Sequence, residues 1–249
     1  MNSEPSSTST PAAGDTFATT HWTVVLAAGR RSTPQSDRAL EELCRTYWYP
    51  LYAYVRRQGH SKEDAEDLTQ GFFARFLERN YLEGLSSEKG RFRAFLLAAL
   101  KHFLANEYDR AGRQKRGGGV PALSLNWQDA EARYRIDPAD QLSPDRLYDR
   151  AWAMTLLEQV IARLREECAA EGKAAAFDQL KPFLMFGKGD IPYAQAAASL
   201  CMNEGAARVA VHRLRGRYRE LLRLEIAQTL SDPADLDEEL RALFLAFGE

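Results

Sequence analysis

Cysteine is scarce in this sequence, and the few cysteines form no recognisable pattern. Cys44, Cys168 and Cys201 lie far apart, no CxxC pair is present, and none has a histidine at the spacing of a metal ligand. Disulfide frameworks and zinc sites are both built from characteristically spaced cysteines. The sequence therefore predicts reduced, buried cysteines, with neither a bound metal nor a cofactor.

A long apolar run and a secretory leader are also lacking. The first residues, MNSEPSSTSTPAAGD, have no basic start and no apolar core, and a secretory signal needs both. The longest apolar stretch, residues 95–105, is interrupted by Lys101 and His102. It is also shorter than the roughly 20 residues that cross a bilayer. We expect a soluble, cytoplasmic protein that does not insert into membranes.

The chain has almost no net charge, which argues against a uniformly basic coat protein for nucleic acid. Its 33 basic and 35 acidic side chains give a formal charge of −2 over 249 residues. The charges are nevertheless segregated along the chain. Residues 205–223 hold six arginines against one glutamate, residues 224–249 hold seven acids against one arginine, and residues 101–116 hold five basic side chains against two acids. The distribution predicts two local basic surfaces and an acidic tail.

Runs of alternating β-branched residues are absent, and nearly every segment has a helical period instead. The predicted fold class is all-α, with two small helical domains joined by a flexible linker. The expected boundaries are a disordered N-terminal segment (1–17), a first helical domain (18–116), a linker (117–143), a second helical domain (144–230) and an acidic C-terminal helix (231–249).

Residues 190–222 of the second domain, DIPYAQAAASLCMNEGAARVAVHRLRGRYRELL, predict a helix-turn-helix. A short helix over 192–200, a turn over 201–203 and a long helix capped by Asn203 match that motif. Small and apolar residues predict the buried stripe of the second helix, leaving a basic face that can grip phosphates or read guanine edges. A plain solvated helix face is the alternative. The exposed candidates are Arg208, His212, Arg213, Arg215 and Arg217.

Two further stretches, GHSKEDAEDLTQGFFARFLERN and GRFRAFLLAALKHFLANEYDRAGRQKR, precede this motif. In that order, the three stretches resemble the bacterial sigma-70 family, in particular its small extracytoplasmic-function type. The resemblance implies no catalytic activity. It implies binding to core RNA polymerase (the β′ coiled coil and the β flap), recognition of promoter DNA at the minus-10 and minus-35 elements, and control by an anti-sigma factor or another regulator.

The resemblance assigns roles to residues at matching positions. The helix that begins near Ser61 would bind polymerase, the helix over about 91–113 would melt and read the minus-10 element, and the basic helix after 203 would read the minus-35 element. The implied sets are Asp64, Asp67, Gln70, Phe73 and Arg75 for polymerase; Phe92, Phe95, Lys101, His102, Asn106, Arg110 and Arg113 for minus-10 DNA; and the five candidates above for minus-35 DNA.

Some of these positions have a structural alternative or depart from the family pattern. Asp64 also suits a helix-capping role beside Ser61, and Phe92 and Phe95 equally suit core packing. Cys201 stands at a turn position usually given to glycine, so a left-handed backbone there would be strained. Val209 and Ala210 replace polar residues of the family's recognition helix, which reduces the polar groups available to the DNA.

Two other interpretations remain open at this point. The chain could be a sigma-like adaptor that binds another protein instead of initiating transcription. An enzyme is disfavoured, because 187–190 (GKGD) lacks the spacing of a phosphate loop and the four histidines are widely separated. The tail could dock through Leu236, Leu240, Leu243, Phe244 and Phe247 and either cap the second domain or mask its basic helix.

Overall fold

The computed structural model describes residues 21–22, 34–77, 90–111, 127–136, 142–185 and 192–247, and every element in these ranges is helical. The all-α prediction is confirmed. The predicted disordered segment 1–17 lies outside the described residues. In chain order the helices are α2 (Pro34–Arg57), α3 (Lys62–Phe76), α5 (Phe92–Ala111), α6 (Trp127–Ile136), α7 (Pro144–Ala170), α8 (Ala174–Leu180), α9 (Pro182–Met185), α10 (Tyr193–Ser199), α11 (Glu204–Gln228), the 3-10 turn η3 (Pro233–Asp235) and α12 (Leu236–Leu245).

Local capping signals explain where three of the helices begin. The side chain of Ser61 accepts a hydrogen bond from the backbone of Asp64 at 3.0 Å, so this predicted cap of α3 is confirmed. Ser143 and Asn203 cap α7 and α11 in the same way. Each cap satisfies a backbone N–H that has no partner within the helix. The segment over 174–185 forms two short helices, α8 and α9, which are separated before Pro182, because the proline ring cannot continue a helix.

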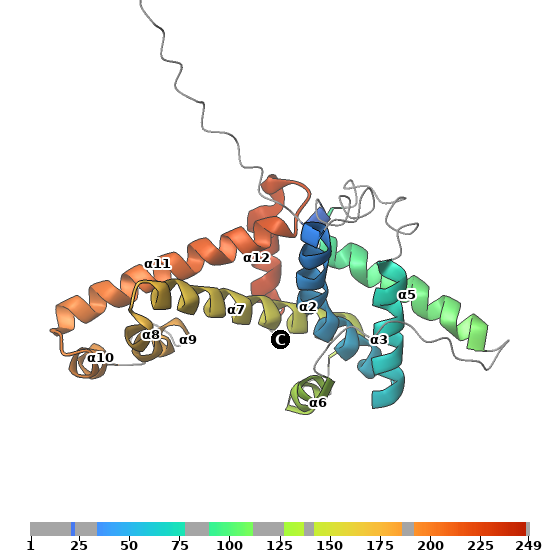
Figure 1. The fold of residues 1–249 in the computed structure, drawn as a ribbon, viewed down its shortest axis with the longest axis horizontal. Coiled ribbons are helices and arrows are strands. Elements are labelled where there is room, and N and C mark those ends of the chain that lie inside the picture. The colour runs from blue at the N-terminus through green and yellow to red at the C-terminus, as the bar shows by residue number, and fades with distance from the viewer. Residues whose placement is uncertain are drawn as a thin grey trace, which may run out of the picture.

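Helix α7 is the central helix of the structure and contacts helices on both sides (Figure 1). It runs from α2 towards the end of the molecule where α8, α9 and α10 lie, and it packs on both α2 and α11, the latter lying alongside it. Trp152 and Leu156 of α7 are buried in the same core as Tyr47 and Leu51 of α2. This contact crosses the predicted boundary between 18–116 and 144–230, so the division into two domains stays a prediction.

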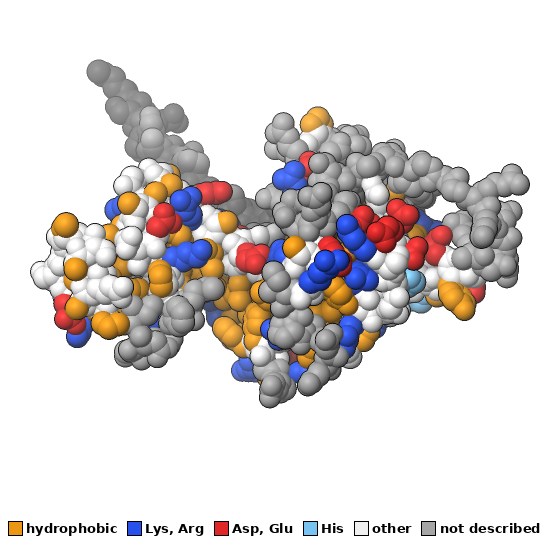
Figure 2. Space-filling view, turned by 90° about the horizontal axis from the view of Figure 1, so that it is seen from below, with side chains coloured by type: hydrophobic (Ala, Val, Ile, Leu, Met, Phe, Trp, Pro, Cys, Tyr) orange, Lys and Arg blue, Asp and Glu red, His pale blue; other side chains and the backbone are white. Residues whose placement is uncertain are grey.

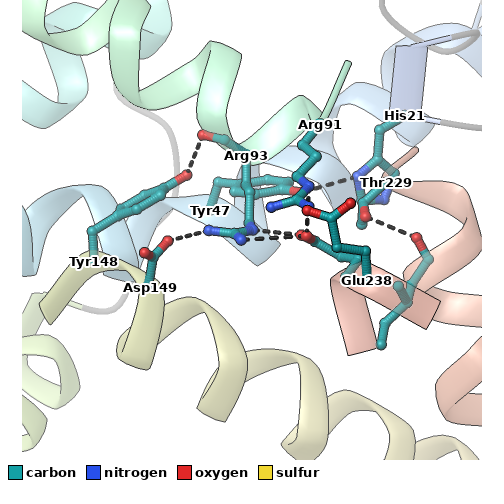
Figure 3. A network of polar contacts seen from close by, with 10 residues as sticks. His21, Tyr47, Arg91, Arg93, Tyr148, Asp149, Thr229 and Glu238 are labelled. Carbon is teal, nitrogen blue, oxygen red and sulfur yellow. Dashed lines mark hydrogen bonds and ion pairs between the residues drawn. The ribbon is translucent and has the colours of Figure 1, made fainter. Parts of the chain in front are cut away.

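A buried polar network lies where α5, α7, α11 and α12 meet (Figure 3). Arg93 of α5 points between Asp149 of α7 and the fully buried carboxylate of Glu239 of α12, and forms ion pairs with both. Tyr148 donates a hydrogen bond to the Arg93 carbonyl at 3.0 Å. Burial by itself would lower the pKa of Arg93, but Glu239 and Asp149 outweigh it and raise that pKa. The guanidinium is therefore charged at every physiological pH.

Backbone and aromatic contacts strengthen the same junction. The backbone N–H of Phe92 donates to the carbonyl of Thr229, at the end of α11, at 3.0 Å. The guanidinium of Arg93 also lies 4.8 Å from the centroid of the Trp152 ring. Close ion pairing and cation–π contact compensate the cost of burying this charge. The start of α5 is thus anchored to both the middle and the end of the chain.

Helix α6 corrects the linker prediction for 117–143, which expected no helix there. Ala130 and Glu131 of α6 are buried against α2. Glu131 accepts a hydrogen bond from Tyr52 at 2.6 Å and a two-pronged one from Arg56, with both distances 3.1 Å. The helix is short and weakly amphipathic in sequence, and these contacts with distant residues stabilise it.

Within the described ranges, no helix combines the length and apolar character needed to cross a membrane. No group of three or more His, Cys, Asp or Glu side chains in those ranges is placed to hold a metal ion. The three cysteines are free thiols, of which Cys44 is buried, Cys168 is half-buried and Cys201 is exposed. Burial raises the pKa of Cys44 to about 12, which makes its thiol unreactive. The prediction of a buried side chain is therefore wrong for Cys201.

Candidate nucleic-acid interface

Helices α10 and α11 pack on each other across a short turn, over the residues that are predicted to form a helix-turn-helix. Ala196 and Ala197 of α10 are buried, and Ala207, Val211 and Leu214 form the buried stripe of α11 as expected. The small alanines on α10 let the two helices pack closely. The backbone of Met202 donates to the Ala197 carbonyl at 3.0 Å and ties the turn to α10. The opposite face of α11 is left for solvent or a ligand.

The turn itself contains a strained residue. Cys201 has φ +50°, and among the described non-glycine residues it is the one with a positive φ. A side chain at such an angle lies close to the backbone, which costs about 1–2 kcal/mol relative to glycine. Cys201 therefore carries the strain that a left-handed backbone imposes on a residue other than glycine.

A groove with basic and aromatic walls runs along α11 beside α9 and α10. Arginine supplies charge and planar hydrogen-bonding groups, and tyrosine supplies a flat stacking surface, so the groove combines features that nucleic-acid sites use. Arg219, Tyr193 and Tyr218 were not among the predicted site residues. Arg219 follows Arg208, His212 and Arg215 at helical spacing. This spacing alone places Arg219 on the same helix face and could have predicted it as a site residue. The groove is lined by Leu184, Tyr193, Arg208, Val209, Val211, His212, Arg213, Arg215, Tyr218 and Arg219.

Three of the five predicted minus-35 residues are available at this groove. Arg208, His212 and Arg213 are all exposed. Arg208 pairs with Glu204 at 2.6 Å, and its guanidinium carbon lies 5.4 Å from the centroid of the Tyr193 ring. Within the described part of the chain, Arg213 and His212 form no ion pair. These two side chains can therefore contact DNA without first breaking an internal bond.

Arg215 and Arg217 both have partners inside the protein, so their role as DNA contacts stays a prediction. Arg215 donates from Nε and Nη2 to the Phe183 carbonyl, at 3.0 and 2.7 Å. Arg217 forms a two-pronged ion pair with Glu167 of α7, at 2.8 Å for both bonds. The hydrogen bonds that Arg217 donates to Glu167 and Glu220 raise its pKa. Both arginines fix α11 to its neighbours.

A second exposed surface lies on α3 and α5, where the polymerase and minus-10 residues were predicted. Asp64 and Asp67 line one groove there together with Lys101. Gln70 is half-buried on the same helix. Arg75, His102 and Asn106 line a smaller hollow with Phe72, Phe76, Ala99 and Phe103. The structure thus brings members of the two predicted sets together across α3 and α5.

Aromatic residues of these sets are core residues, so two predicted contacts are wrong. Phe73 is fully buried and packs on Phe72, with ring centroids 5.6 Å apart. Phe92 is fully buried and packs on Trp22, with centroids 5.2 Å apart. A side chain without exposed surface cannot contact polymerase or stack on a base while this packing persists. Phe95 is half-buried against Trp22, as its core-packing alternative expected.

The remaining minus-10 candidates are only partly described. Lys101 is exposed, but it pairs with Asp145 at the start of α7. Arg110 belongs to α5, with its side chain outside the described part, and Arg113 lies outside the described residues altogether. Residues 78–89, between α3 and α5, also lie outside the described residues.

The acidic tail packs on α7 and α11, and none of its described residues lines the basic groove. Its 3-10 turn and α12 bury Leu243, while Phe244 is 62% exposed and Phe247 39% exposed. Of the predicted docking residues, Leu236, Leu240 and Leu243 pack against the core, whereas the prediction is wrong for the two exposed phenylalanines. Of the basic residues over 205–223, Arg223 pairs with the tail, at 3.1 Å from Asp237, and Arg223 does not line the groove.

Comparison of the chain with protein-family models, with curated proteins and with solved structures gives no match. The assignment of a function therefore depends on the site itself.

Proposed function

We propose that this protein is a sigma factor, which binds core RNA polymerase and directs transcription initiation at specific promoters. The observation that carries the proposal is the helix-turn-helix of α10 and α11. Its exposed helix face holds Arg208, His212 and Arg213 in a groove beside two tyrosines. Such a helix enters the major groove of duplex DNA through its N-terminal residues.

The surface of α3 and α5 supports the second half of the proposal. Asp64 and Asp67 are exposed on α3 and suit a basic protein surface such as the one the resemblance implies on polymerase. His102 and Asn106 are exposed on α5, beside an aromatic hollow, and suit contacts to DNA. Two separate surfaces on one chain fit a protein that joins a large enzyme to its template.

Run-off transcription with purified core polymerase tests the proposal. The protein should form a stable complex with core and support initiation from a defined set of promoters in a genomic library. Asp67→Ala should weaken binding to core, while Glu171→Ala, an exposed acid at the far end of α7, should not. A protein that neither binds core nor starts transcription would instead be a sigma-like adaptor.

One observation favours that adaptor alternative. Arg93, Asp149 and Glu239 fasten both halves of the chain together, a rigid arrangement that suits a protein-binding scaffold. Co-purification separates the two functions, because an adaptor would retain a protein partner other than polymerase.

A further inference from the structure

A stack of side chains leads from the core to the DNA-facing surface of α11. The buried ring of Phe183 in α9 lies against the ring of Tyr193 in α10, with centroids 5.3 Å apart and planes inclined by 16°. The guanidinium of Arg208 in α11 lies over the same tyrosine ring. An arginine over an aromatic face is held by cation–π attraction.

The stack begins and ends on α11. Arg215, two turns after Arg208, holds the Phe183 carbonyl with two hydrogen bonds. Phe183 then supports Tyr193, and Tyr193 supports Arg208. Contacts from α9, α10 and α11 therefore fix the position of the Arg208 guanidinium, even though this side chain is 63% exposed. An unsupported arginine of this exposure samples many rotamers, and ordering it on binding costs affinity.

We infer that Tyr193 is a specificity-determining positioning residue, which presents the Arg208 guanidinium to a guanine edge in duplex DNA. The inference rests on the proposed DNA-binding function. Arg208 is the fifth residue of α11, within the part of a recognition helix that reaches base edges. Arginine donates two parallel hydrogen bonds to O6 and N7 of guanine, a geometry that needs a fixed guanidinium plane.

Other basic residues of the groove have a different role. Arg213 has no aromatic support and no ion pair within the described residues. A mobile arginine suits a phosphate contact, which needs charge but little orientation and carries no sequence information. Glu204, bound to Arg208 at 2.6 Å, is 49% exposed, and an exposed pair of this kind is readily exchanged for a DNA contact.

Selection of duplexes from a random-sequence pool by the full-length protein tests this inference. We expect enrichment of a guanine at one position, with a preference of roughly 5- to 100-fold over other bases, the range of a bidentate contact. Tyr193→Leu should remove most of this preference with little change in the salt dependence of binding. Tyr193→Phe keeps the ring and should keep the preference.

Two variants on α11 complete the test without disturbing the stack's scaffold. Arg208→Lys retains the charge but loses the planar fork, so it should lose the guanine preference and keep the salt dependence. Arg213→Ala should weaken binding to all duplexes alike and reduce the salt slope by about one. The Arg208→Lys result stands even if Tyr193→Leu fails to fold.

The failures are distinguishable. A wild-type protein that enriches no sequence would overturn the DNA-binding role and this inference with it. Enrichment that survives unchanged in Arg208→Lys, or in a folded Tyr193→Leu variant, would overturn the inference alone.

Discussion

At the residue scale, Cys201 strains the turn between α10 and α11. Its φ of +50° suits glycine, and its side chain is exposed and has no core contact to lose. We expect Cys201→Gly to raise the free energy of unfolding by about 1 kcal/mol, because relief of the strain exceeds the extra entropy of an unfolded glycine. Urea unfolding measures the change. Ala198→Gly, at an exposed helical position three residues earlier, should instead lower stability by about 1 kcal/mol; equal effects of the two variants would contradict the strain argument.

At the element scale, α6 depends on one buried carboxylate. Burial by itself would raise the pKa of Glu131, but hydrogen bonds from Arg56, Tyr52 and Arg135 outweigh it and lower that pKa from 4.5 to about 2. The folded state thus favours the charged form. Its contribution to stability is complete above pH 4.5 and is lost as the pH falls through about 2.

The variant Glu131→Gln tests this dependence on pH. At pH 7 it should lower the free energy of unfolding by roughly 3 kcal/mol, the equivalent of the pKa shift. The difference from the wild-type protein should shrink in urea titrations between about pH 4.5 and pH 3. As a control, Glu158→Gln on α7 removes an ion pair with Arg133 of α6. It should lower the free energy of unfolding by less than about 1 kcal/mol. A pH-independent Glu131→Gln effect would show that packing, not charge, holds α6.

The helix starts could be predicted from the sequence, whereas the contacts between distant helices could not. The beginnings of α3, α7 and α11 follow from capping residues within three positions of the helix start. Docking of α6 depends on Tyr52 and Arg56, which lie 79 and 75 residues away from Glu131. Arg215 and Arg217 likewise find their partners 32 and 50 residues away. Local signals therefore predicted these helix starts and the basic face, whereas the internal partners of two arginines on that face follow only from the tertiary structure.

At the scale of the whole molecule, opposite charges mostly neutralise one another locally. Basic and acidic side chains lie interspersed on the face drawn in Figure 2. The six arginines over 205–223 follow the same rule in part, since Arg208, Arg217 and Arg223 each pair with a carboxylate. The net charge of the chain therefore carries little information about its partners, and the exposed groove on α11 carries more.

The acidic tail stabilises the junction, and none of its described residues lines the groove on α11. The buried carboxylate of Glu239 pairs with Arg93, so Glu239→Ala would leave this buried cation with Asp149 as its one carboxylate partner among the described residues. We expect the variant to lower the free energy of unfolding by about 3–5 kcal/mol, which corresponds to roughly 10 °C in Tm.

The exposed pair between Asp237 and Arg223 gives the matched control. Asp237→Asn removes this pair and should leave Tm unchanged and DNA affinity within about twofold, because an exposed pair is weak. Calorimetry and fluorescence anisotropy at matched salt measure both. A tenfold gain in DNA affinity for Asp237→Asn, with an unchanged Tm, would show that the tail competes with DNA after all.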